Sequence, residues 1–280
     1  MIQKIAVLLT CHNRKFKTLE CLQSLFKQEG LDEVFTISVF LVDDGSTDGT
    51  AEAIKSKFPL VNLIKGNGNL YWNRGMHLAW DMAATTNQFD YYLWLNDDTF
   101  LEKDAIKMLL IRRFDNGIVS GSTHSSINKQ ITYGGFKKNP NRLIEPNGEF
   151  QSCDFFNGNC VLISKKVFEL VGNLDPIFQH ALGDFDYGLR AIKKGIELYI
   201  APKFVGVCES HTEAPKWMSA SVKLKERIKN LYSASSGCYP PEFFVYDKRH
   251  NGLISACFHY FTIHLRVMFP NLRNGINLSK

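Results

Sequence analysis

The chain has 280 residues and buries roughly 75% of its unfolded surface if it folds as one large unit, so it needs no disulfide bonds for stability. Its apolar fraction of 45% and charged fraction of 22% exclude collagen-like, low-complexity and disordered architectures. The net charge of +5 is small and its 33 Lys and Arg are spread along the chain, which gives no indication of a nucleic-acid partner.

Cysteine usage and the N-terminal segment bear on the compartment. The seven cysteines are odd in number and include no C-x-x-C pair, so we expect neither a disulfide framework nor a structural zinc site, and a reducing compartment fits best. The apolar run at the N-terminus stops at residues 12–14, too early for a membrane span, and has no small-residue cleavage site. We therefore expect a cytoplasmic protein whose first residues form a buried strand.

Apolar runs and helical patterns alternate through the first hundred residues. Residues 4–10 are continuously apolar, which is typical of a strand covered on both faces. The predicted strands are residues 4–10, 36–42, 61–65 and 91–95, and the predicted helices are about 16–27, 51–58 and 73–84. This order predicts βαβ units and a mainly parallel sheet flanked by helices.

The second half of the chain changes character twice. Residues 117–155, rich in Gly, Asn, Ser and Pro, predict loops and hairpins over the sheet, with a short strand near 130–133. Next come a predicted strand at 160–164, helices at 165–171 and 184–194, and a strand at 197–201 that ends before Pro202. Helices are then predicted at 216–233 and 253–269, with breaks at Pro240-Pro241 and Asn251-Gly252. We expect an α/β domain over residues 1–215 and a helical extension over 216–280.

Two acidic pairs directly follow predicted strands: Asp43-Asp44 and Asp97-Asp98. Ligands of parallel α/β sheets bind beyond the carboxyl ends of the strands. Either pair alone could cap a turn or helix. Two pairs at strand ends, with the glycine-rich turn at 66–69 between them, indicate a site.

The motifs around these pairs resemble a known family. Thr10-Cys11-His12-Asn13-Arg14 followed by residues 42–48 is similar to the opening nucleotide-binding segment of family 2 glycosyltransferases with the GT-A fold. Leu95-Asn96-Asp97-Asp98 stands where that family carries a D-x-D metal motif, and residues 183–190 resemble its later acidic motif. The resemblance covers residues 1–211. It implies a Rossmann-like GT-A sheet and inverting transfer of a sugar from a nucleotide diphosphate to a hydroxyl.

The resemblance also implies a divalent cation, Mg²⁺ or Mn²⁺, which neutralises the diphosphate leaving group. Asp98 would ligate the metal, and Asp97 would point toward the ribose or the metal's water shell. Asn96 replaces the first acid of the D-x-D motif and leaves one fewer charged ligand. His211 stands where many relatives place a histidine ligand, although a lone histidine also fits a structural role.

Asp43 and Asp44 are expected to accept hydrogen bonds from a pyrimidine base and the ribose. Arg74 could pair with phosphate, or lie in solvent on its helix. Tyr71 and Trp72 could shape a sugar or acceptor pocket, or only pack. The residues expected on the donor side are Thr10, Asn13, Arg14, Asp43, Asp44, Asn73, Arg74, Asn96 and Asp97.

Sugar transfer to a hydroxyl needs a general base near the acceptor oxygen. By resemblance Asp184 is that base, and Asp186 is the fallback as base or acceptor-hydroxyl binder. Two positions apart at a helix start, they cannot face the same way, so only one is expected to be catalytic. Arg190 could hold either carboxylate and lie beside the acceptor pocket. Alternatively, both acids only stabilise the first helical turn.

The sequence does not decide what the helical extension binds or packs against. Residues 253–269 are rich in aromatic and aliphatic side chains but contain His259, His264 and Arg266, which argues against a membrane span. A helix at the inner face of the cell membrane, a helix packed on the first domain, and a contact in a homo-oligomer all fit.

The expected partners are a nucleotide-sugar donor, UDP- or dTDP-linked, and a glycan or lipid-linked acceptor of surface polysaccharide biosynthesis. UDP-hexoses, UDP-galactofuranose and dTDP-rhamnose all fit, and resemblance to bacterial rhamnosyltransferases favours rhamnose. The alternatives are a sugar-phosphate nucleotidyltransferase, against which the absence of a glycine-rich phosphate loop after residues 4–10 weighs, and a non-catalytic sugar-binding protein. The sugar, acceptor, linkage and oligomeric state are not given by the sequence.

Overall fold

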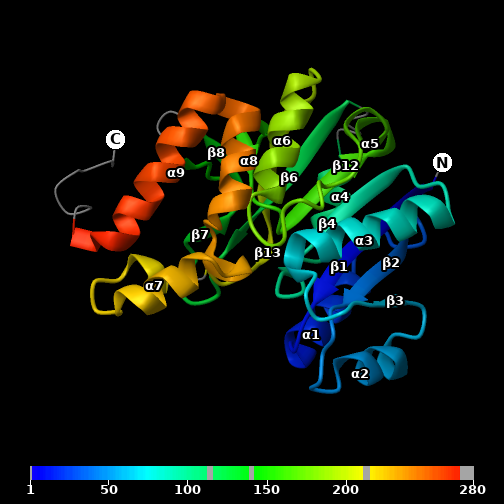
Figure 1. Ribbon diagram of the computed structural model, residues 1–280. Helices are drawn as coiled ribbons and strands as arrows, with labels where there is room; N and C mark the ends of the chain where they lie inside the picture. The colour runs from blue at the N-terminus through cyan, green and yellow to red at the C-terminus, as the bar shows by residue number, and fades with distance from the viewer. Residues whose placement is uncertain (1, 112–115, 139–141, 211–214, 272–280) are drawn as a thin grey trace.

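A computed structural model describes residues 2–111, 116–138, 142–210 and 215–271 (Figure 1). Its strands are β1 (Gln3–Cys11), β2 (Phe35–Asp43), β3 (Asn62–Lys65), β4 (Tyr91–Leu95), β5 (Phe100–Leu101), β6 (Gly117–His124), β7 (Ile131–Tyr133), β8 (Gly135–Lys137), β9 (Arg142–Leu143), β10 (Gln151–Ser152), β11 (Phe155–Phe156), β12 (Cys160–Ser164) and β13 (Glu197–Val207). Its helices are α1 (Lys15–Leu25), α2 (Thr50–Lys57), α3 (Tyr71–Thr86), α4 (Ala105–Leu110), α5 (Lys165–Val171), α6 (Gly183–Lys193), α7 (Leu224–Leu231), α8 (Pro240–Asn251) and α9 (Leu253–Met268), with 3-10 turns at Lys216–Met218 and Ala234–Ser236.

Within the described ranges, ten strands form one mixed sheet in the order β10-β13-β6-β12-β4-β1-β2-β3, with β5 beside β13 and β7 beside β6. The strands β1, β2, β3 and β4 run parallel, whereas β12 runs antiparallel between β4 and β6. Therefore β12 begins at the same edge of the sheet where β1, β2 and β4 end. A separate small sheet contains β11, β8 and β9.

The continuous apolar run of β1 serves two cores. Ile5, Val7 and Leu9 are fully buried in a cluster with side chains of α1, α2 and α4. Ala6 and Leu8 are fully buried in a second cluster with side chains of α3, α5 and α6. Because successive side chains of a strand point to opposite faces, helices on both faces require an apolar residue at every position of β1.

The prediction of loops over residues 117–155 is wrong at its start, because β6 is a buried strand inside the sheet. Its Ser120 and Ser122 are fully buried, and a Cβ on Gly121 would collide with the side chain of Val205 on β13. The small residues that suggested a loop are there because the neighbouring strand's side chain packs directly onto β6.

The predicted end of the strand before Pro202 is also wrong. The register of β13 against β6 shifts between Ile200 and Phe204, so Pro202 lies in an irregular stretch that needs no ladder hydrogen bond. Beyond it, Gly206 and Val207 pair with β5.

The helical extension differs from its predicted pattern. The expected helix over 216–233 is split into the 3-10 turn Lys216–Met218 and α7, and Pro240 begins α8 rather than breaking the chain. Proline fits the first helical turn because its missing N–H has no intrahelical partner there. Figure 1 shows α8 beside α6, with α9 packed on α8. None of the helices in the described ranges is both long and apolar enough to cross a bilayer.

Candidate active site

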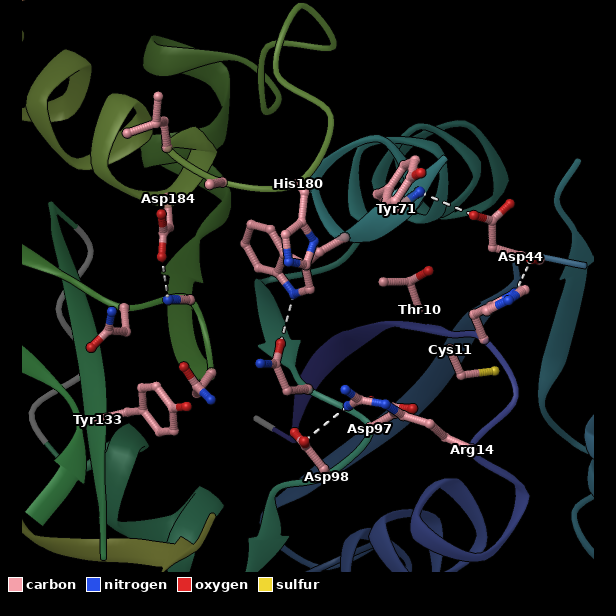
Figure 2. A pocket seen from close by; sticks show the side chains of 18 of the residues that line it. Thr10, Cys11, Arg14, Asp44, Tyr71, Asp97, Asp98, Tyr133, His180 and Asp184 are labelled. Carbon is pink, nitrogen blue, oxygen red and sulfur yellow. Dashed lines mark hydrogen bonds and ion pairs between the residues drawn. The ribbon is translucent and has the colours of Figure 1, made fainter. Parts of the chain in front are cut away.

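A cavity of about 590 Å³ opens at the edge of the sheet where β1, β2 and β4 end (Figure 2). Asp98 and Asp184 both line it, so carboxylates far apart in the sequence share one space. The wall comes from the ends of β1, β2 and β4, the start of α3, the segment before β12 and the start of α6. The lining residues are Thr10, Cys11, His12, Arg14, Asp44, Tyr71, Trp72, Asn96, Asp97, Asp98, Tyr133, Asn157, Gly158, Asn159, His180, Ala181, Leu182, Asp184 and Phe185.

One arginine bridges the acidic pair that follows β4. Arg14 Nη1 donates to Asp97 Oδ1 at 3.1 Å and to Asp98 Oδ2 at 2.9 Å. Both carboxylates are buried, whereas the Arg14 side chain is 39% exposed. Thr18 Oγ1 also donates to Asp97, at 3.3 Å. The two buried carboxylates share the Arg14 guanidinium, and Lys17 Nζ lies 3.9 Å from Asp98 Oδ2.

The carboxyl group of Asp97 is hard to ionise. Burial raises its pKa to about 6; Arg14 acts to lower this pKa, and the negative charge of Asp98 acts to raise it. Asp97 is therefore ionised at neutral pH but takes up a proton at a higher pH than an exposed aspartate does.

Asp184 lies across the cavity, at the start of α6. Its Oδ2 accepts the Gly158 N–H at 2.9 Å and its Oδ1 accepts the Phe185 N–H at 2.9 Å. Burial raises the pKa of Asp184 to about 6, although these backbone N–H groups act to lower it. Among the charged side chains of the described residues, no salt-bridge partner lies within 4.0 Å of Asp184. This carboxylate is therefore held in place without being neutralised.

The wall between these carboxylates contains Trp72. Its Nε1 donates to Asn96 Oδ1 at 2.6 Å, and its ring meets Trp94 edge-on with centroids 6.0 Å apart. A Cβ on Gly158 would collide with the Trp72 ring, so glycine is required there. The indole is therefore fixed from three sides.

Asp44 supports the loop that leads into α3. Its Oδ1 accepts the Gly68 N–H at 2.7 Å, and its Oδ2 accepts the N–H groups of Leu70 at 2.8 Å and Tyr71 at 3.0 Å. His12 Nδ1 donates to the Asp44 backbone oxygen at 2.6 Å. Asp44 thus reaches the cavity while its carboxylate anchors the loop.

The structure places Asn73 and Arg74 outside the cavity lining. Asn73 is fully buried, and its Nδ2 donates to the backbone oxygens of Asp175 and Phe178, both at 2.8 Å. Arg74 Nε donates to the Pro176 oxygen at 2.8 Å. These side chains hold residues 175–178 against α3, because their positions on the helix turn them away from the sheet edge.

Asp186 and Arg190 also lie outside the cavity lining. Asp186 is fully buried and accepts hydrogen bonds from Arg190 Nε at 2.8 Å, Arg249 Nη1 at 2.8 Å and His250 Nε2 at 2.9 Å. Burial acts to raise the pKa of Asp186, but the hydrogen bonds from His250, Arg190 and Arg249 outweigh it and keep that pKa below its ordinary value. We call these four residues the Asp186 cluster; it joins α6 to α8.

Asn13 and Asp43 lie beside the cavity but do not line it. Asn13 has left-handed backbone (φ 51°), and its Oδ1 accepts the Thr47 N–H at 2.7 Å. Asp43 Oδ1 accepts the Ser46 N–H at 3.0 Å. Asn13 fastens the turn after β2 to the end of β1, and Asp43 closes that turn from within. His211 lies outside the described residues.

Several lining residues had no role in the sequence-based prediction: His12, Tyr133, Asn157, Asn159, His180 and Leu182. His12 belongs to the motif at residues 10–14, so its position in that motif could have identified it as a lining residue. Asn157 and Asn159 precede β12, and their position at the cavity follows from the antiparallel direction of that strand. The apolar run of β12 does not encode its direction, so no local signal could have found them.

Comparison with known proteins identifies the family. The model for "Glycosyl transferase family 2" matches residues 6–172. The chain belongs to this family, which sets the nucleotidyltransferase alternative aside.

Individual relatives are distant. An N-acetylglucosaminyl-diphospho-decaprenol L-rhamnosyltransferase of Mycobacterium tuberculosis is 25% identical over 200 residues, which are 59% of this chain, and the match spans 64% of that relative's length. A mannosyltransferase of Pyrobaculum calidifontis, solved with GDP-Man and Mn²⁺, has a TM-score of 0.54 at 16% identity, covering 96% of this chain and 72% of that chain. S. aureus TarS has a TM-score of 0.56 at 13% identity, covering 93% and 49%. The fold is therefore GT-A, as predicted.

Proposed function

We propose that the protein is an inverting glycosyltransferase that moves a sugar from a UDP- or dTDP-linked donor to a hydroxyl group of a glycan or lipid-linked acceptor. The observation that carries this proposal is the position of the carboxylates. Figure 2 draws Asp184 on one side of the cavity and Asp97, Asp98 and Arg14 on the other. A donor whose diphosphate lies beside Asp98 would present its sugar toward Asp184.

Asp184 is the proposed general base. With a pKa of about 6 it is ionised at neutral pH, yet its affinity for a proton is higher than that of an exposed aspartate. It accepts the proton of the acceptor hydroxyl as that oxygen bonds to the anomeric carbon. The bond from the anomeric carbon to the diphosphate oxygen breaks, and its electron pair leaves with the nucleoside diphosphate.

The residues after β4 suit a divalent cation. Asp97 and Asp98 are two hard oxygen donors already bridged by one cationic group, Arg14, and Mg²⁺ sites commonly use one or two carboxylates together with substrate phosphates. In the described ranges no group of three or more His, Cys, Asp and Glu is arranged around a metal site, and His211, the other predicted ligand, lies outside those ranges. When bound, Mg²⁺ or Mn²⁺ would neutralise charge on the leaving diphosphate.

The nucleoside is proposed to lie toward the ends of β1 and β2, between Thr10 and Asp44. The loop that Asp44 holds brings Tyr71 to this end of the cavity, and Trp72 follows toward Asp184. The sugar would then lie against Trp72, whose fixed indole offers an apolar surface for a sugar face.

Similarity to the mycobacterial rhamnosyltransferase favours rhamnose as the sugar and a lipid diphosphate as the acceptor anchor. Because identity to that relative is 25%, donor preference needs its own measurement. A thermal-shift panel of UDP-, dTDP- and GDP-sugars, with and without Mn²⁺, tests it. Binding at a hundredfold excess over Kd adds about 2.7 kcal/mol of stability.

We expect a dTDP- or UDP-sugar to raise the melting temperature more with Mn²⁺ than without, and Asp98→Asn to remove the Mn²⁺-dependent part. The same panel with Asp81→Asn, an exposed carboxylate on α3, controls for loss of charge alone. Stabilisation by GDP-sugars alone, or a Mn²⁺ effect that persists in Asp98→Asn, would contradict the proposal.

A further inference from the structure

The helix α9 carries apolar side chains on two opposite faces. Its inward face is formed by Ala256, Ile263 and Val267, which are at most 3% exposed and pack in the C-terminal part of the molecule. A surface helix of a globular protein normally has one apolar face and one polar face. The other face of α9 therefore needs an explanation.

That outer face is a continuous apolar stripe. Ile254 is 89% exposed, Phe258 63%, Phe261 62% and Met268 44%, and the half-buried Leu265 lies between the last two. The spacing of these residues, four, three, four and three positions, places them on one side of the helix. We call them the outer face of α9: Ile254, Phe258, Phe261, Leu265 and Met268. Single exposed apolar residues are ordinary, but a row of five large ones marks an interaction surface.

The helix α7, whose Leu231 packs with Ile263 and Val267 of α9, carries exposed basic charge. Tyr232, just after α7, is hydrogen-bonded to His264 of α9 at 2.7 Å. On α7 itself, Leu224 and Ile228 are 44% and 42% exposed, and the exposed Lys225 and Lys229 follow at the next position in each turn. Apolar and basic side chains thus alternate along a helix tied to α9.

The exposed charges of the helical extension have one dominant sign. Within residues 215–271, Glu242 and Asp247 are buried, which leaves Glu226 as the exposed acid. The exposed basic residues of the same stretch are Lys216, Lys223, Lys225, Lys229, Lys248 and Arg266. An extension with exposed basic residues and an exposed apolar row complements a surface that is negatively charged outside and apolar within.

We propose that the outer face of α9, together with α7, binds the surface of a membrane containing anionic lipids. The apolar row enters the boundary between headgroups and acyl chains, and the α7 lysines contact the headgroup phosphates. This arrangement goes beyond the proposed sugar transfer and does not depend on which sugar is moved. A second copy of the chain fits less well, because a two-fold contact through this face would bring the lysines of both copies together.

Vesicle co-sedimentation of the full chain tests the proposal, with vesicles of phosphatidylcholine alone and of phosphatidylcholine mixed with phosphatidylglycerol. We expect binding to the mixed vesicles. Ile254→Asp combined with Phe258→Asp should lower the partition coefficient at least about tenfold, because two large apolar side chains no longer leave water. The matched control is Leu60→Asp with Ile127→Asp, at positions 83% and 86% exposed elsewhere on the protein, which should bind like the unmodified chain.

Replacing Lys225 and Lys229 with Gln should lower binding to the mixed vesicles by about fivefold per lysine. Equal binding by the Ile254/Phe258 double variant and the unmodified chain would overturn the proposal, as would failure of the unmodified chain to bind mixed vesicles. Normal binding by the lysine variant would show that the α7 lysines do not contact anionic headgroups, and would overturn that part of the proposal. A dimer in analytical ultracentrifugation that the Ile254/Phe258 variant dissociates, without vesicle binding, would assign the surface to a second copy instead.

Discussion

Asp184 and Asp186 stand two residues apart on α6 but belong to two different regions of the molecule. Asp184 opens into the cavity, is held by two backbone N–H groups, and has a pKa raised to about 6. Asp186 lies in the contact between α6 and α8, is bonded to two arginines and a histidine, and has a lowered pKa. The same side chain is thus poised to accept a proton in one region and to remain a fixed anion in the other.

This contrast follows from helix geometry and from the neighbours it selects. A separation of two positions turns a side chain to a nearly opposite side of the helix. One side of α6 meets the open cavity, and the other meets α8. Under the proposed mechanism the acidic motif combines a catalytic position and a structural one, and substitutions at the two positions should have opposite consequences.

Asp184→Asn should have the largest effect on activity. The amide oxygen can still accept the Gly158 N–H, so the fold should be kept, but the general base is lost. We expect turnover lower by about 10²–10⁴-fold with the donor Kd nearly unchanged. Steady-state kinetics and calorimetric donor titration measure the two quantities. Near-normal turnover would remove Asp184 from the mechanism.

The pH dependence of turnover should report the ionisation of Asp184. A base must be unprotonated to work, so activity should fall as pH drops through about 6, where burial places the pKa of Asp184. The pKa of Asp97 is also about 6, so turnover should fall up to a hundredfold per pH unit well below it if both groups must be ionised. In Asp97→Asn the remaining activity should fall only tenfold per unit. A profile flat from pH 7 to pH 5 would contradict this assignment.

Asp186→Asn should reverse the pattern seen at Asp184. It leaves Arg190 and Arg249 without their shared anion, and because both are partly exposed we expect a loss of about 2–3 kcal/mol of unfolding free energy. Urea unfolding measures this loss. Turnover per folded molecule should change by less than tenfold. A stable variant with the activity loss expected for Asp184→Asn would mean that the roles of the two acids are exchanged.

Arg74→Gln should have the smallest effect. Its guanidinium bonds backbone oxygens of residues 176 and 177 at the surface, away from the cavity lining. We expect a stability change of about 0.5 kcal/mol and an unchanged donor Kd. A tenfold higher donor Kd in this variant would indicate that Arg74 contacts the nucleotide after all.

Strongly patterned elements were predictable from the sequence. The strands at 91–95 and 160–164 and the helix at 165–171 match the structure to the residue, because their apolar runs have clear ends. The strand β6 was missed because Gly121 and its neighbouring serines reflect contact with β13, which lies about 80 residues later.

The site was predictable where it depends on strand ends and not where it depends on distant partners. Asp97, Asp98 and Asp184 line one cavity, and the roles that the motifs gave them stay predictions. Asp186 lies outside the cavity because it is bonded to Arg249 and His250, which are more than sixty residues away in the sequence. No local pattern reports such a pairing, so the sequence could rank Asp184 above Asp186 by resemblance but could not show what holds Asp186.

The contact between the first turns of α3 and α6 has a mechanical consequence. A Cβ on Gly183 would collide with the amide of Asn73, and that amide in turn holds the backbone of residues 175 and 178. Trp72 and Asp184 therefore belong to one rigid block. Under the proposed mechanism, this contact would keep the distance between Trp72 and Asp184 fixed while the opposite wall of the cavity moves.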